Sequence, residues 1–324
     1  MYLITGVAGF IGSKTAMLSL EKGIKVVGID NLNNYYDIKI KKFRLEELKK
    51  YDDFVFEKGD IEDKKFLNNI FKKHAAFKAV INLAARAGVR YSLENPFIYA
   101  NTNYSGSLNL LDLIRKFNIS KYVMASTSSI YAGAKMPYKE ESSVNKPISP
   151  YSASKKAAEL IAYTYHHQFK VDVSILRYFT VYGPAGRPDM SVLRFIKWID
   201  EGKPIILYGD GSQARDFTFI DDIAIGTLLA TQKQLGYEII NLGGGKNPIS
   251  INVVISKIES LLNRKALIKQ LPFHSADVEA TWASIDKAKK ILNWEPKISL
   301  DIGLDKTVSW YYKNKSWLKK INFI

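Results

Sequence analysis

Short apolar runs alternate with longer amphipathic stretches along the first half of the chain. The runs have the length and β-branched content of buried strands, which we expect at Tyr2–Thr5, Lys25–Ile29, Phe54–Phe56, Ala79–Asn82, Tyr122–Ala125 and Asp172–Leu176. The longer stretches have the pattern of helices, which we expect near 10–22, 63–73, 97–117 and 151–168. Strands that are apolar throughout and separated by helices indicate a parallel sheet covered on both faces.

The regular alternation ends after about Tyr178. A segment rich in Gly and Pro at 183–188 follows, and later elements are expected as a strand at 205–208 and helices at 191–201, 221–233, 251–263, 285–292 and 301–315. The sequence therefore predicts an α/β fold: a Rossmann-type doubly wound parallel sheet with a smaller mixed α/β C-terminal substrate-binding domain. We expect the first domain to span 1–178, with a later segment near 217–243 crossing back to it. The second domain then occupies most of 179–324.

Composition narrows the functional classes. The 324 residues include no cysteine, which excludes a disulfide framework and a thiolate nucleophile, and the four histidines lack metal-ligand spacing, so no metal is expected. The net charge of +15 comes mostly from dispersed lysines beside acidic residues, a pattern of solvated helix faces rather than of a nucleic-acid groove. With neither a secretion signal nor an apolar stretch of about 18 residues, we expect a cytoplasmic protein that does not bind membranes.

A glycine-rich turn follows the first expected strand directly and opens a helix. Gly6, Gly9 and Gly12 permit a tight turn and close approach of the backbone to a pyrophosphate, which the helix N-terminus attracts. Phe10 and Ile11 belong to the same turn. Asp30, at the end of the second strand, can accept hydrogen bonds from a ribose and repel a 2′-phosphate. This arrangement predicts a site for NAD rather than NADP.

A second constellation carries candidate catalytic groups. Tyr151 and Lys155 are four positions apart, so both side chains lie on one face of a helix. A lysine cation stabilises a phenolate, which allows Tyr151 to act as a base near neutral pH. Thr127 lies at the carboxyl end of the fifth strand, the edge where doubly wound folds bind ligands. Its hydroxyl can assist the proton transfer.

With these three motifs in order, the chain resembles the extended short-chain dehydrogenase/reductase family over nearly its whole length, and within it the nucleotide-sugar 4-epimerases. The resemblance implies that Tyr151 and Lys155 also contact the nicotinamide ribose, and that Thr127 is the catalytic hydroxyl. Further cofactor contacts implied in this way are Asn31, Asp60, Ile61, Leu83, Ala84, Ala85, Asn101 and Tyr178. The family also implies a homodimer packed through the helices near 97–117 and 151–168.

The residues after Thr127 discriminate between reactions on this framework. Dehydratases of the family carry an acidic pair there and uronate decarboxylases carry a glutamate, whereas this chain has Ser128 and Ser129. This chain therefore lacks, at these positions, the acid that elimination of water from the sugar requires. Three segments, at 30–37, 84–92 and 186–190, are similar to those of UDP-glucuronate 4-epimerases.

A uronate carboxylate needs hydrogen-bond donors, and Arg187, Thr180, Ser128 and Ser129 can supply them. The resemblance places Arg215 on the diphosphate and Asp277 on the UDP ribose, while a second diphosphate arginine of the galactose-type enzymes falls at His274. Arg90, Met190 and Tyr208 complete the expected substrate site.

The resemblance thus implies an NAD-dependent epimerase that inverts C4 of a UDP-sugar through a transient 4-keto sugar, with UDP-glucuronate and UDP-galacturonate as the expected pair. UDP-glucose/UDP-galactose 4-epimerase is the main alternative, followed by an epimerase of N-acetylated sugars. A non-catalytic NAD-binding regulatory protein is a third class, which the presence of Thr127, Tyr151 and Lys155 disfavours.

Overall fold

The structure is a computed structural model that describes residues 1–74, 76–274 and 277–323. The larger unit contains a seven-stranded parallel sheet. Residues 2–178 supply β1 (Tyr2–Thr5), β2 (Val26–Asp30), β3 (Phe54–Lys58), β4 (Ala79–Asn82), β5 (Lys121–Thr127) and β6 (Asp172–Tyr178), and the last strand, β11 (Tyr237–Leu242), comes from later in the chain. The strand order is β11-β6-β5-β4-β1-β2-β3, so the chain starts inside the sheet and winds outward in both directions. The expected doubly wound α/β fold is confirmed.

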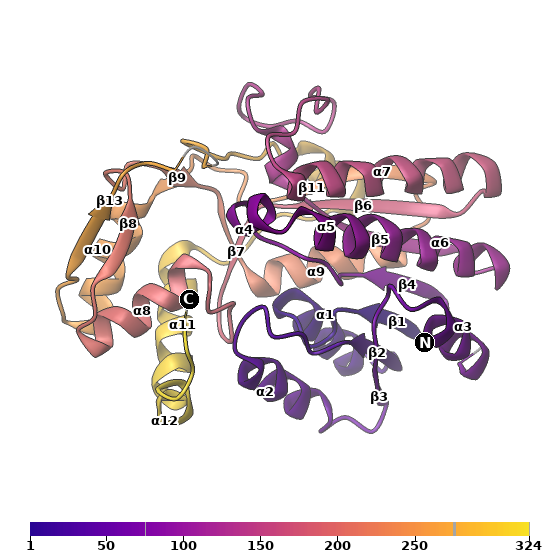
Figure 1. Ribbon diagram of the computed structural model, residues 1–324, viewed down its shortest axis with the longest axis horizontal. Helices are drawn as coiled ribbons and strands as arrows, with labels where there is room; N and C mark the ends of the chain where they lie inside the picture. The colour runs from indigo at the N-terminus through magenta and orange to yellow at the C-terminus, as the bar shows by residue number, and fades with distance from the viewer. Residues whose placement is uncertain (75, 275–276, 324) are drawn as a thin grey trace.

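Helices cover both faces of this sheet (Figure 1). One face carries α1 (Phe10–Glu21), α2 (Ile38–Leu48) and α9 (Ile220–Gln232), and the other carries α3 (Lys64–Lys73), α6 (Gly106–Lys116) and α7 (Pro150–Phe169). Successive strand residues point to opposite faces, so the adjacent Leu3 and Ile4 are both fully buried but belong to different apolar clusters. This double burial explains why the strands are apolar throughout.

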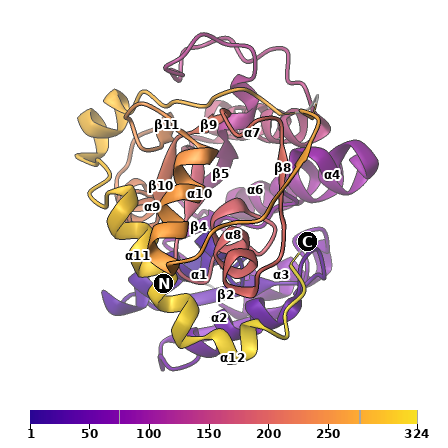
Figure 2. The ribbon, with the colours of Figure 1, turned by 90° about the vertical axis from the view of Figure 1, so that its left-hand side faces the viewer.

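A smaller unit follows β6 and lies at one end of the sheet (Figure 2). Its three two-stranded sheets pair β7 (Thr180–Tyr182) with β10 (Phe217–Phe219), β8 (Ile205–Tyr208) with β13 (Ile268–Leu271), and β9 (Ala214–Arg215) with β12 (Ile249–Ser250). Its helices are α8 (Ser191–Glu201), α10 (Ile251–Leu262), α11 (Leu300–Lys313) and α12 (Lys315–Leu318). No helix of the described ranges is long and apolar enough to cross a membrane.

Several elements depart from the sequence expectations. The run expected at 97–117 consists of α5 (Pro96–Tyr99), the π-helical η1 (Ala100–Ser105) and α6, and α4 (Val89–Glu94) precedes it. The helix expected at 285–292 is largely the π-helical η3 (Ala288–Leu292). Helix α2 and strand β11 were not predicted, because buried polar residues interrupt the apolar pattern of each. The clearest examples are Lys41 and Arg44 in α2 and Asn241 in β11.

Candidate active site

The glycine-rich turn packs too closely for side chains. A Cβ on Gly12 would lie 2.1 Å from the carbonyl oxygen of Gly6, and one on Gly6 would lie 2.7 Å from the backbone nitrogen of Ala84. Gly6 also has φ of +67°, which L side chains rarely adopt. Gly9 is the N-cap of α1, and Phe10 and Ile11 begin the helix. The turn therefore brings bare backbone and a helix N-terminus together, as a pyrophosphate site requires.

Gly12→Ala is expected to release NAD and to lower the free energy of unfolding by about 1–3 kcal/mol, because the methyl group meets fixed backbone. Gly23→Ala is the matched control. A Cβ there meets nothing within 4 Å, although φ of +70° adds strain of about 1–2 kcal/mol. Urea unfolding and the NAD content of the purified variants check the prediction. Full NAD content in Gly12→Ala would contradict it.

Asp30 is held in place at the carboxyl end of β2. Its carboxylate accepts hydrogen bonds from the backbone N–H groups of Ala8, at 3.1 Å, and Leu32, at 2.8 Å. The ammonium of Lys41 on α2 lies 3.9 Å away, and both side chains are 6% exposed. Burial lowers the pKa of Lys41, and Asp30 opposes that effect. Lys41 is a candidate cofactor contact that the sequence motifs did not indicate.

Further expected cofactor contacts lie beside this carboxylate. Asn31 donates a hydrogen bond from its side-chain amide to Asp60, at 2.6 Å, which ties the end of β2 to the segment after β3. Ile61 is buried and packs against Gly106 of α6, where an added Cβ would lie 2.5 Å from the Ile61 side chain. These residues form a continuous edge next to Asp30.

The loop after β4 contains Leu83, Ala84 and Ala85. The next residue, Arg86, is held by the side chain of Asn103 on η1. The Asn103 side chain accepts a hydrogen bond from the backbone N–H of Arg86, at 2.8 Å, and donates one to the backbone carbonyl of Arg86, at 3.0 Å. Asn103 also donates to Ser154 Oγ of α7, at 2.9 Å. Asn101, an expected cofactor contact, is exposed on η1. Asn103 is thus the residue that joins this loop to the catalytic helix.

The candidate catalytic residues converge where β5 ends against α7. Ser149 caps α7 through a reciprocal capping box with Ser152, which fixes the first turn that carries Tyr151. One turn further, Lys155 Nζ donates to the backbone carbonyl of Ala125 on β5, at 2.8 Å.

Both groups have shifted pKa values. Burial lowers the pKa of Lys155 to about 8, and Glu159 opposes that shift. Burial raises the pKa of Tyr151, which a hydrogen bond with Thr127 and the charge of Arg187 oppose. Tyr151 therefore needs the cations around it in order to ionise near neutral pH.

Hydroxyl groups line the strand end next to Tyr151. Thr127 Oγ1 donates to Ser129 Oγ, at 3.1 Å, and its oxygen caps η2 (Ser128–Tyr131) by accepting from the backbone of Ser129. Tyr178, at the end of β6, has its hydroxyl hydrogen-bonded to Thr227 of α9 in the core, at 2.9 Å. Its side-chain hydroxyl is therefore engaged away from the sheet edge, and its backbone is the part left for the expected cofactor contact.

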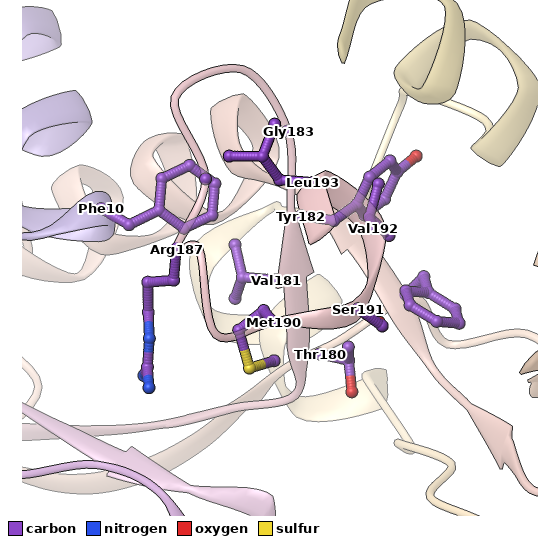
Figure 3. A pocket seen from close by; sticks show the side chains of 12 residues that line it. Phe10, Thr180, Val181, Tyr182, Gly183, Arg187, Met190, Ser191, Val192 and Leu193 are labelled. Carbon is purple, nitrogen blue, oxygen red and sulfur yellow. The ribbon is translucent and has the colours of Figure 1, made fainter. Parts of the chain in front are cut away.

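An arginine–aspartate pair lies near these hydroxyls, in the loop before α8. Arg187 donates to Asp189 from Nε at 3.0 Å and from Nη2 at 2.5 Å, and the two side chains are 22% and 15% exposed. Burial lowers the pKa of Arg187, but Asp189 outweighs burial and holds it above the ordinary value. Arg187, Met190 and Thr180 line one pocket with Phe10 of the cofactor turn, and the polar ends of Arg187 and Thr180 point to the same side (Figure 3).

A second cluster of charged and aromatic groups lies where α4 meets the smaller unit. Arg90 of α4 donates to both oxygens of Asp277, at 3.3 and 2.6 Å, and lies 3.8 Å from the ring centroid of Tyr208. Burial lowers the pKa of Arg215 on β9, and Asp277 opposes that effect. His274 packs edge-on against the Tyr208 ring, with centroids 6.2 Å apart. These groups can receive a nucleoside diphosphate between the two units.

The chain belongs to a family of nucleotide-sugar enzymes: residues 3–307 match the family described as GDP-mannose 4,6 dehydratase. It is 58% identical to a UDP-glucuronate 4-epimerase of Thermodesulfobacterium geofontis, over 99% of this chain and 98% of that protein. The sequence-based assignment to this family is confirmed.

Two solved structures are similar as well. UDP-glucuronic acid 4-epimerase from Bacillus cereus, in complex with UDP-glucuronic acid and NAD, superposes with a TM-score of 0.90 at 35% identity, covering 97% of this chain and 99% of that one. UDP-glucose 4-epimerase from Thermotoga maritima, with UDP-glucose, gives a TM-score of 0.87 at 30% identity, with the same coverage. Both relatives thus bind UDP-sugars on this fold.

Proposed function

We propose that this protein is an NAD-dependent epimerase that inverts C4 of a UDP-sugar, and that it interconverts UDP-glucuronate and UDP-galacturonate. The observation that carries the proposal is the convergence of Thr127, Tyr151 and Lys155 beside the largely buried guanidinium of Arg187. The first three residues fit oxidation and reduction of a sugar alcohol, and the fourth fits a carboxylate on that sugar. The Bacillus cereus relative, crystallised with UDP-glucuronic acid and NAD, supports the same substrate and cofactor.

In the proposed mechanism, Tyr151 removes the proton of the sugar 4-hydroxyl, assisted by the hydroxyl of Thr127. The charge of Lys155 stabilises the phenolate, and Lys155 holds its place through the carbonyl of Ala125. NAD, held by the glycine turn and Asp30, supplies a hydride acceptor and donor at C4. Arg215 and Asp277 anchor the UDP while the 4-keto sugar turns to present its opposite face. The hydride would return to C4 on that face and invert it, and Tyr151 returns its proton to the 4-oxygen.

A uronate adds a chemical constraint. The 4-keto form of a glucuronate is a β-keto acid, and it loses CO2 when the carboxylate stands perpendicular to the ketone. Ser128, Ser129 and Thr180 can hold the carboxylate near the plane of the carbonyl by hydrogen bonds rather than by desolvating it. The two serines occupy the positions where dehydratases need an acid, so elimination of water has no proton donor there.

Ser129→Ala is expected to release CO2 in a detectable fraction of turnovers and to lower kcat several-fold, by about 1 kcal/mol in the barrier, because one restraint on the carboxylate is lost. NMR detection of a UDP-pentose by-product measures the effect. Ser260→Ala, on the exposed face of α10, serves as the control. Unchanged kinetics without CO2 release would remove Ser129 from this role.

The decisive experiment is an NMR time course with equimolar UDP-glucuronate and UDP-glucose and no added NAD. Growth of UDP-galacturonate alone supports both the uronate substrate and a retained cofactor. Growth of UDP-galactose instead would keep the mechanism and replace the substrate, which is the alternative that the Thermotoga maritima relative represents. No conversion of either sugar after NAD is supplied would contradict the proposed activity.

We further propose that the protein acts as a homodimer in the cytoplasm. The outer face of α7 exposes Leu160, Tyr163 and Phe169, with exposed fractions of 58%, 49% and 47%, next to α6. Apolar side chains exposed along one helix are typical of an interface between subunits. Sedimentation equilibrium tests the dimer, and Leu160→Glu is expected to shift it toward monomer.

A further inference from the structure

A buried ion pair lies directly behind the candidate catalytic residues. Arg177 of β6 and Glu159 of α7 have side chains that are each 1% exposed. The guanidinium donates to the carboxylate from Nε at 2.9 Å and from Nη2 at 2.7 Å. Replacing a buried pair by packed apolar side chains is often neutral or stabilising, so stability alone is a weak reason for its presence. Its position suggests a role in the site.

The pair is built into the junction that aligns the catalytic residues. Ser126 Oγ of β5 donates to Glu159 Oε1, at 2.6 Å. Ser126 lies between Ala125, whose carbonyl accepts from Lys155 at 2.8 Å, and Thr127, whose side chain lowers the pKa of Tyr151. Three successive residues of β5 therefore meet three turns of α7. Glu159 occupies the turn after Lys155.

The pair also balances charge around Lys155. Glu159 is the charged group that opposes the loss of the Lys155 proton. Arg177 and Lys156 face the same carboxylate, and other titratable groups packed near the pair are Tyr131 of η2, Tyr237 of β11 and Glu140, whose backbone carbonyl accepts from Arg177. Removing the carboxylate takes away the charge that favours the protonated form of Lys155, and it leaves the buried guanidinium of Arg177 without its partner. Removing both groups takes away the same charge without leaving Arg177 unpaired.

We propose that Glu159, held by Arg177 and Ser126, is a positioning residue that keeps Lys155 charged and in register with Thr127 and Tyr151. The proposal rests on the catalytic roles proposed above for Lys155 and Tyr151. It assigns a functional reason to two residues of the core that touch neither substrate nor cofactor.

The test is the titration of Lys155 in the NAD-bound protein, followed by NMR of 13Cε-labelled lysine and assigned with Lys155→Met. Glu159→Gln is expected to move the loss of the Lys155 proton to lower pH by about one unit, because the carboxylate that opposes that loss is gone. The alkaline fall of kcat/KM should move with it. In the double variant Glu159→Gln/Arg177→Met, both shifts are expected to persist, because the carboxylate is still absent.

Asp172→Asn is the matched control, because Asp172 pairs with Lys121 in a similarly buried ion pair at the other end of the same two strands. This variant should leave the Lys155 titration unchanged. If Glu159→Gln does not fold, Arg177→Met is the second variant, and its uncompensated carboxylate should move the titration to higher pH.

An unmoved titration in Glu159→Gln, or a wild-type titration in the double variant, overturns the proposal. In Arg177→Met, no shift or a shift to lower pH has the same meaning. The NMR titration does not depend on turnover. A wild-type protein that fails to convert UDP-glucuronate would therefore contradict the proposed function and leave the charge coupling to be judged on its own.

Discussion

Tyr151→Phe is expected to lower kcat for the interconversion of UDP-glucuronate and UDP-galacturonate by about 10³-fold, within the range that general acid–base catalysis supplies. The change removes one oxygen and leaves the ring, which packs edge-on against Tyr99 with centroids 6.0 Å apart. The fold, the NAD content and the affinity for UDP-glucuronate should therefore persist. Steady-state kinetics followed by NMR measure kcat, and calorimetry measures the affinity for UDP-glucuronate, so the two effects are distinguished.

Tyr163→Phe is the matched control for this loss. Tyr163 lies on the same helix, 49% exposed, so it undergoes the same chemical change away from the junction of β5 and α7. Its kcat should match that of the wild type. Loss of a general base should leave far less than a tenth of the activity. If Tyr151→Phe retained more than about a tenth of the wild-type kcat, Tyr151 would not be the base.

The parts of the site that the sequence predicted are those whose geometry is local. Gly6, Gly9 and Gly12 belong to one turn, and Tyr151 and Lys155 are separated by one helical turn. Residue spacing alone places such groups once the element type is known. The same holds for the sheet, because strands buried on both faces must be apolar at every position.

The residues that sequence reasoning missed depend on partners far along the chain. Lys41 and Arg44 read as solvated charges, yet α2 buries both. Arg44 donates to the carbonyls of Ala185 and Gly186, about 140 positions later, and so holds the loop that precedes Arg187. Such a contact leaves no periodic signal, because its acceptors are backbone carbonyls brought close only by the folded chain.

Ion pairs across the site were equally hidden. Arg90 and Asp277 were both expected to contact substrate, but their pairing joins positions 187 apart, on α4 and on the segment after β13. Arg187 was expected as one of four donors to a carboxylate, and its pairing with Asp189 was not predicted. Both arginines are therefore preorganised by aspartates. Their remaining donors, rather than their full charge, are what a substrate meets.

Because Arg187 is paired with Asp189, its role in substrate choice has to be tested with a double variant. Replacing Arg187 alone would leave the largely buried Asp189 carboxylate without its partner, and the loss of stability would obscure the effect on binding. The double variant Arg187→Gln/Asp189→Asn removes both charges and keeps similar volumes. The single variant Asp189→Asn retains Arg187 and serves as the matched control.

The double variant is expected to lower kcat/KM for UDP-glucuronate by about 10- to 100-fold, because a hydrogen bond between charged groups contributes about 1.5–3 kcal/mol. The inhibition constant of UDP should stay within about two-fold, since UDP lacks the carboxylate and the anchors proposed for it are Arg215 and Asp277. Asp189→Asn should keep the uronate activity, because the guanidinium remains available. An equal loss of affinity for UDP and UDP-glucuronate in the double variant would place Arg187 on the diphosphate instead. Selectivity for the uronate would then have to come from Ser128, Ser129 and Thr180 alone.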